Sequence, residues 1–168
     1  GSTFSFTLTL ERGHEIMPTT DKHQEPKEEK LSTKKVLVAE DNPVNQEVMQ
    51  LMLEQYPVEV VMVENGADAV QRFNDEYFDL IMLDLQMPVM DGWEAAKIIK
   101  YGQVFAQRPA PLVAVTANAF ESDKVKALSQ GFDDFIAKPV MPDKLEQVLF
   151  NFGVLNSELK QKNKQGQE

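Results

Sequence analysis

The sequence predicts an α/β domain: a (βα)5 three-layer sandwich, with a five-stranded parallel sheet between two layers of helices. Two observations lead to this prediction. Five short apolar runs alternate with five segments in which apolar residues recur at helical spacing. The apolar runs are continuous rather than alternating, as expected for strands that helices cover on both faces. A length of 168 residues with 42% hydrophobic content is sufficient for one packed domain.

Each element has a local signal. Asn42 is suited to cap a helix that begins at Pro43, and Gly131 is suited to end a helix in the left-handed conformation. Residues 102–111, which are rich in Gln and Pro, are expected to form a loop. The strands are expected at residues 36–39, 58–63, 80–84, 112–116 and 135–137, and the helices at residues 43–55, 67–74, 93–101, 121–130 and 142–150.

The two ends of the sequence have a different composition from its middle. Residues 12–34 are polar and mixed in charge, so we expect a flexible linker. Residues 154–168 are expected to form a C-terminal tail for the same reason. The folded domain is therefore placed at residues 35–153, and residues 1–11 form a separate short segment.

Charge and composition exclude several functions. Residues 35–150 contain 19 of the 27 acidic residues but 9 of the 17 basic ones, which accounts for the net charge of -10. We expect such a surface to repel nucleic acid and anionic membranes. Solubility alone is an alternative explanation of the acidic surface. No apolar run approaches the roughly 20 residues of a membrane helix. The first residues lack the pattern of a secretion signal, and the absence of Cys fits a reducing compartment.

Polar residues close four of the five apolar runs. Glu40 and Asp41 follow the first run, and the third ends in Asp84. The fourth ends in Thr116 and the fifth is followed by Lys138. Because the carboxyl ends of parallel strands meet at one edge of the sheet, these residues are expected to converge there.

Three converging carboxylates require a compensating cation. Mg²⁺ fits best, since it prefers oxygen ligands, and Mn²⁺ is an alternative. With Lys138 and the Thr116 hydroxyl, the set supplies what phosphoryl transfer to an aspartate needs. Taken singly, each residue has a plainer explanation: Asp84 and Thr116 as turn formers, Glu40 and Asp41 as a helix-start signal.

The motifs VLVAEDNPVNQ, DLIMLDLQMPVMDGWEA, VAVTAN and DDFIAKP, in this order, resemble the receiver domain of two-component response regulators. The resemblance implies a flavodoxin-like fold, with the strands of the sheet in the order 2-1-3-4-5. It also implies that Asp84 is the phosphoacceptor, that Asp41 binds Mg²⁺ directly and that Glu40 acts mainly through a bound water. The main-chain carbonyl of Gln86 would be a further metal ligand.

The same resemblance assigns a conformational switch. Lys138 would contact the phosphoryl group, aided by a cis peptide bond to Pro139. Thr116 would move toward a phosphoryl oxygen, and Phe135 would turn inward with it. Glu40 and Phe135 stand where the family more often has Asp and Tyr. The surface from about Phe120 to Phe150 is expected to change most.

EDNPVNQ and DLQMPVMDG further resemble the receivers of hybrid sensor histidine kinases. This implies a phosphodonor on a histidine kinase dimerisation domain and a histidine phosphotransfer protein as acceptor. GSTFSFTLTL resembles the end of a kinase ATP-binding domain, so residues 1–11 would be a remnant of one, although Gly1-Ser2 also fits a cloning scar. We expect a cytoplasmic domain whose parent chain could be anchored in the inner membrane; the oligomeric state stays open.

Other classes of protein fit the sequence less well than a receiver does. A haloacid-dehalogenase-type phosphatase needs a second Asp where this chain has Gln86, and a flavin binder would be repelled by Glu40 and Asp41. A stand-alone response regulator and a receiver that binds partners without phosphorylation stay as alternatives. The receiver itself would be a self-catalysing phosphoacceptor rather than a classical enzyme, with kinase activity in the parent chain.

Overall fold

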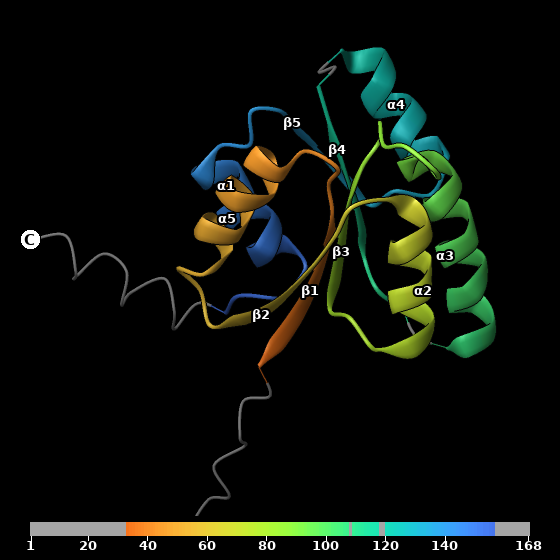
Figure 1. Ribbon diagram of the computed structural model, residues 1–168, viewed down its shortest axis with the longest axis horizontal. Coiled ribbons are helices and arrows are strands. Elements are labelled where there is room, and N and C mark those ends of the chain that lie inside the picture. Colours follow the sequence, from red (N-terminus) through yellow and green to blue (C-terminus); the bar gives the residue numbers. More distant parts are fainter. Residues whose placement is uncertain (1–32, 108, 118–119, 157–168) are drawn as a thin grey trace, which may run out of the picture. The chain divides into compact units, whose positions relative to one another are not determined.

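The structure is a computed structural model, and it describes residues 33–107, 109–117 and 120–156 (Figure 1). The predictions for residues 1–11 and 157–168, and for most of the linker, lie outside the described residues. Five strands alternate with five helices. They are β1 (Lys34–Ala39), α1 (Pro43–Leu53), β2 (Val58–Val63), α2 (Gly66–Asp75), β3 (Leu80–Asp84), α3 (Gly92–Ala106), β4 (Leu112–Thr116), α4 (Glu121–Ser129), β5 (Asp134–Ala137) and α5 (Pro142–Asn151).

All strand pairs are parallel, and the sheet has the predicted order β2-β1-β3-β4-β5. The order places β1 beside β3, with Ala39 paired to Leu83. On the other side of β3, Asp84 pairs with Val115 of β4. The ends of the three central strands therefore lie at the same level of one sheet edge.

Helices cover both faces of the sheet, α1 and α5 on one and α2, α3 and α4 on the other (Figure 1). Each face has its own apolar core. Leu37 and Ile81 belong to the core under α2, α3 and α4, whereas Val36 and Met82 belong to the core under α1 and α5. Neighbouring residues of one strand point to opposite faces, so the continuous apolar runs reflect burial on both sides.

The helix boundaries follow the predicted signals closely. The Asn42 side chain accepts hydrogen bonds from the backbone N–H groups of Val44 and Asn45, and Pro43 is the first residue of α1. Gly131, with φ 101°, follows the end of α4 as expected. In the described part of the chain, no helix is long and apolar enough to cross a membrane.

The loop predicted at residues 102–111 is wrong in its first half, because α3 continues to Ala106. In a sequence pattern, Gly102 favours the end of a helix. In the structure, its missing side chain lets α3 pack closely against α2. A Cβ at this position would lie 2.9 Å from the ring of Phe73 on α2. The helix ends at Ala106, and the next residue, Gln107, adopts a left-handed conformation with φ 50°.

The ends of the folded region also differ slightly from the prediction. Lys34, predicted to lie in the linker, is the first residue of β1, where its ammonium group bonds to Asp79 at 2.9 Å. Val154 and Leu155, predicted to lie in the tail, are buried in the core beneath α1 and α5. These apolar residues continue the core after α5 has ended.

Candidate functional site

Three carboxylates converge at the sheet edge where β1 and β3 end. Asp84 is the last residue of β3, and Glu40 and Asp41 directly follow β1. One oxygen of each lies within 4.8 Å of one oxygen of each of the other two. Glu40 and Asp84 are each only 4% exposed, whereas Asp41 is exposed. The predicted convergence is therefore present, with Asp41 on the solvent side.

The ammonium group of Lys138 lies between the two buried carboxylates. Its Nζ is 2.6 Å from Glu40 Oε2 and 2.5 Å from Asp84 Oδ2. Lys138 follows β5, two strands away from β3, and its peptide bond to Pro139 is cis, as expected. The lysine supplies a positive charge to a site that would otherwise hold two buried negative charges.

The pKa values of this pair follow from burial and charge. Burial raises the pKa of Asp84, and it outweighs the opposing effects of the Gln86 backbone N–H and of Lys138. For Lys138, burial lowers the pKa, but the hydrogen bonds to Asp84 and Glu40 outweigh it and the net shift is upward. Lys138 is therefore held as a cation at neutral pH.

The first turn of α1 holds Glu40 in place. Asn45 Nδ2 donates to Glu40 Oε1 at 3.0 Å, and the Asn42 backbone N–H donates to the same oxygen at 3.2 Å. Gln46 Nε2 donates to the Glu40 backbone carbonyl at 2.5 Å. Sequence reasoning missed Asn45 and Gln46. The helical spacing that places both side chains over the end of β1 could have identified them.

Two glycines allow the loop after β3 to approach the site. A Cβ on Gly92 would lie 2.2 Å from the carbonyl oxygen of Asp84, and a Cβ on Gly66 would lie 2.6 Å from that of Met90. The Gly66 N–H also donates to Met90 O at 2.9 Å. Both glycines are required by backbone packing, since neither close approach leaves room for a side chain.

Gln86 lies in this loop, where its backbone N–H donates to Asp84 Oδ1 at 3.0 Å. Its side chain is exposed, and Gln86 lines an open depression together with Asp41, Pro88 and Trp93. The depression thus connects the acidic cluster to solvent. An ion in this depression would meet Asp41 first, the exposed member of the cluster.

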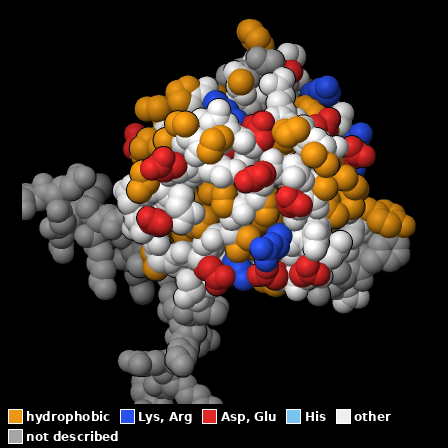
Figure 2. Space-filling model, viewed as in Figure 1, with side chains coloured by type: hydrophobic (Ala, Val, Ile, Leu, Met, Phe, Trp, Pro, Cys, Tyr) orange, Lys and Arg blue, Asp and Glu red, His pale blue; other side chains and the backbone are white. Residues whose placement is uncertain are grey.

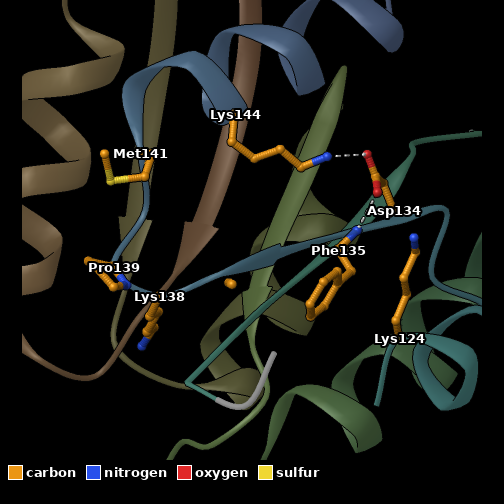
Figure 3. A pocket seen from close by; sticks show the side chains of 8 residues that line it. Lys124, Asp134, Phe135, Lys138, Pro139, Met141 and Lys144 are labelled. Atoms are coloured by element: carbon orange, nitrogen blue, oxygen red, sulfur yellow. Dashed lines mark hydrogen bonds and ion pairs between the residues drawn. The ribbon is translucent and has the colours of Figure 1, made fainter. Parts of the chain in front are cut away.

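The two predicted switch residues lie on neighbouring strands. Thr116 is buried at the end of β4, and its backbone carbonyl accepts a hydrogen bond from the Lys138 N–H at 2.7 Å. Phe135 is half-buried on β5 and lines a groove of about 480 Å³ with Lys124, Met141 and Lys144 (Figure 3). Figure 3 shows the Phe135 ring between Lys124 and Lys138.

The chemistry of the cluster fits a hard divalent cation. All three side chains offer oxygen atoms, and the exposed Asp41 leaves room for the water ligands that Mg²⁺ retains. The buried Glu40 and Asp84 already attract one cation, the ammonium group of Lys138. The residues present can therefore hold Mg²⁺ or Mn²⁺.

A doubly wound parallel sheet with three carboxylates and a lysine at one edge defines a flavodoxin-like domain with an acidic cluster suited to a cation. The chain belongs to the response regulator receiver domain family, which matches residues 36–150. The class inferred from fold and site and the family found by comparison agree.

The curated relatives of the chain include sensor histidine kinases and hybrid signal transduction histidine kinases. The chain is 35% identical to sensor histidine kinase GacS of Pseudomonas protegens over 87% of its own length and 16% of that protein. It is 37% identical to hybrid signal transduction histidine kinase L of Dictyostelium discoideum, over 71% of the chain and 7% of that protein. The chain thus spans less than a fifth of the length of either relative.

Two solved structures are informative. The receiver domain of sensor histidine kinase PA1611 from Pseudomonas aeruginosa, with a magnesium ion coordinated in its active site cleft, is 33% identical with a TM-score of 0.64. The match covers 72% of this chain and 98% of that one. A co-crystal structure from Saccharomyces cerevisiae contains the phosphotransfer protein Ypd1 and the receiver domain of Ssk1. It matches at 32% identity and a TM-score of 0.68, over 72% of this chain and 89% of that one.

Proposed function

We propose that this receiver accepts a phosphoryl group from a phosphohistidine onto Asp84 and passes it to a histidine of a phosphotransfer protein. The observation that carries the proposal is the position of Asp84. Its carboxylate lies at the end of a central strand, within reach of Glu40 and Asp41 and in contact with Lys138. A nucleophile, a metal-binding group and a fixed cation are thus present together.

The proposed step is a displacement at phosphorus. An Asp84 oxygen attacks the phosphorus atom, the bond from phosphorus to the donor imidazole nitrogen breaks, and its electron pair returns to that nitrogen. The product is an acyl phosphate on Asp84. The reverse displacement by a histidine of a second protein regenerates the carboxylate. Ionised Asp84 is required, so its burial beside Lys138 must leave the nucleophile charged when a donor arrives.

Asp41, Asp84 and the Gln86 carbonyl would hold the metal ion directly, and Glu40 would act mainly through a water molecule. When bound, the ion supplies positive charge to the phosphoryl oxygens during transfer. Lys138 would add a second positive charge by turning from the carboxylates toward a phosphoryl oxygen. The magnesium ion in the related PA1611 receiver supports this proposal.

A partner surface lies next to the site on α1. Val44, Val48 and Leu51 are exposed at helical spacing and form an apolar stripe, and Val48 lines the same hollow as Glu40. Such a stripe fits the apolar face of a helical partner. Phosphotransfer proteins are the expected partners, and the complex of the similar Ssk1 receiver with Ypd1 supports this choice.

Phosphorylation would also change the conformation of the domain. A phosphoryl group adds negative charge and acceptor oxygens that Thr116 and Lys138 can contact only in the phosphorylated state. Phe135 lines the groove beside Lys138, so a shift of Lys138 or Thr116 would be transmitted to its ring. The surface formed by α4, β5 and α5 would carry the signal.

We further infer that the chain is the receiver portion of a hybrid sensor histidine kinase, since kinases of this type are its curated relatives. The kinase activity would then reside in parts of a longer protein. The domain itself would act in the cytoplasm, where a phosphohistidine is formed.

The test uses phosphoramidate, which carries a P–N bond as phosphohistidine does. The protein is incubated with phosphoramidate and Mg²⁺, and its intact mass is measured. We expect a gain of one phosphoryl group that disappears in Asp84→Asn and after chelation of the metal. A wild-type mass that stays unchanged, or a gain that survives in Asp84→Asn, would overturn the proposed function.

A further inference from the structure

We propose that Asn45 is a positioning residue that orients the Glu40 carboxylate and thereby sets the affinity of the acidic site for a divalent cation. This inference rests on the proposed function in one respect, since it takes Glu40, Asp41 and Asp84 as the metal site. It extends that function to a residue outside the cluster, on the first turn of α1.

The two oxygens of Glu40 have different partners. Oε1 accepts hydrogen bonds from Asn45 Nδ2 at 3.0 Å and from the Asn42 N–H at 3.2 Å, whereas Oε2 lies 2.6 Å from Lys138 Nζ. The donors on one side thus fix the plane of the carboxylate, with its other oxygen directed toward the cation. A carboxylate with an oxygen fixed in this way cannot rotate freely about its last bond.

Asn45 and Gln46 act on different parts of Glu40. Gln46 donates to the backbone carbonyl and fixes the end of β1 relative to α1. Asn45 acts on the carboxylate itself. Asn45 is exposed although Glu40 is buried, so the asparagine can be replaced without opening the apolar core. This makes the role of its amide testable apart from folding.

Orientation matters because Glu40 must serve two cations in turn. It now faces Lys138, and in the proposed cycle it also contributes to a metal ion beside Asp41. Hydrogen bonds that orient metal-site carboxylates typically change metal affinity by about 10-fold to 100-fold. The Asn42 N–H remains on the same oxygen when Asn45 is replaced, so we expect the lower end of this range.

The first experiment measures Mg²⁺ affinity in the full chain by titration calorimetry or by the fluorescence of Trp93. This is the one tryptophan of the sequence, and it lines the same depression as Asp41. We expect Asn45→Ala to weaken Mg²⁺ binding by about 10-fold. Asn74→Ala, the same change at an exposed position of α2, is the control and should leave the affinity unchanged.

The second experiment separates positioning from a general structural effect. Asn45→Ala is introduced into Glu40→Ala, which removes the acceptor of the Asn45 hydrogen bond, and its effect on Mg²⁺ affinity is compared with its effect in the wild type. If Asn45 acts through Glu40, its replacement should have almost no further effect in the Glu40→Ala background. A 10-fold loss that persists there, or an unchanged affinity in Asn45→Ala alone, overturns the inference. A wild-type protein that binds no Mg²⁺ would instead contradict the proposed function.

Discussion

Lys138 supplies the counter-charge for two buried carboxylates, Glu40 and Asp84. Without this lysine, the two carboxylates should repel each other and destabilise the fold. In chelator, we expect Lys138→Met to lower the free energy of unfolding by about 2 kcal/mol. The loss is smaller than for a fully buried ion pair because the ammonium group of Lys138 is partly exposed. Mg²⁺ should raise the Tm of Lys138→Met more than that of the wild type, since the ion no longer competes with an ammonium group. Equal Tm shifts in thermal denaturation would contradict this.

Asp84 gives a prediction about pH. Its pKa is raised above the ordinary value of 3.8, so folding favours the protonated form. The stability contributed by this group is therefore fully present below about pH 3.8 and is lost as the pH rises through the folded-state pKa. In chelator, Asp84→Asn should be more stable than the wild type at pH 7, and the difference should shrink toward pH 4. Urea denaturation at both pH values measures this; a less stable Asp84→Asn at pH 7 would refute it.

Gly92, the first residue of α3, lies directly against the backbone carbonyl of Asp84. In Gly92→Ala the new Cβ would clash with the Asp84 carbonyl, so we expect a loss of about 2 kcal/mol and weaker Mg²⁺ binding. Gly153→Ala is the matched control, because Gly153 has a φ of 70° and a Cβ added there would meet no neighbouring atom within 4 Å. It should cost about 1 kcal/mol and leave Mg²⁺ binding intact. Similar metal affinities in both variants would argue against the role of Gly92.

Helix α1 has two roles in the proposed relay. Its first turn holds Glu40, and its exposed apolar stripe would receive the phosphotransfer protein. Replacing Leu51 by Glu should leave phosphorylation by phosphoramidate unchanged, because Leu51 is distant from the acidic cluster along the helix. It should slow transfer to a phosphotransfer protein that accepts phosphate from the wild type, by about 10-fold or more.

The control for this element is Ile98→Glu, an equally drastic change at an exposed apolar position of α3. It should leave transfer to the phosphotransfer protein unchanged. Equal losses in both variants, measured as transfer rates, would show that the effect is one of surface charge rather than of docking on α1.

The elements were predictable where local patterns coincide with tertiary packing. The strands at 58–63, 80–84 and 112–116 have the predicted bounds, because short apolar or β-branched runs flanked by polar and turn residues admit few alternatives. The end of α3 was not predictable. Gly102 and the following Gln-rich residues indicate a loop, and only the contact with Phe73 explains why the helix continues. That contact depends on how α2 and α3 pack, which no local pattern contains.

The candidate site was largely predictable from strand ends, since a parallel sheet brings Glu40, Asp41 and Asp84 together. The strand ends also predict Lys138 near them, but its contact with two carboxylates depends on side-chain geometry. Asn45 was missed for a similar reason. Its side chain contacts Glu40 across a turn, and an asparagine inside a helix carries no signal of such a role.

For the whole molecule, the acidic surface has a direct consequence. Acidic side chains are spread over the face in Figure 2 and are interspersed with apolar ones. With a net charge of -10, the chain should not bind nucleic acid or anionic vesicles at moderate salt. Sedimentation with such vesicles should leave the protein in the supernatant, and co-sedimentation would contradict this expectation.

Phosphorylation should change one side of the molecule more than the other. With Mg²⁺ and a phosphoryl mimic, amide NMR shifts should be large around α4, β5 and α5, including Phe135 and Lys124 at the groove. Shifts on α2, which packs against α3, should be small. An unchanged α4–β5–α5 surface would contradict the proposed switch.

The proposed function depends most on whether the three carboxylates bind a divalent ion. The direct measurement is a crystal structure grown with Mn²⁺, studied by anomalous diffraction. We predict a strong anomalous peak bonded to oxygens of Asp41 and Asp84, with Glu40 oriented toward it. No peak at this site under saturating Mn²⁺, with Lys138 still between Glu40 and Asp84, would contradict the central claim.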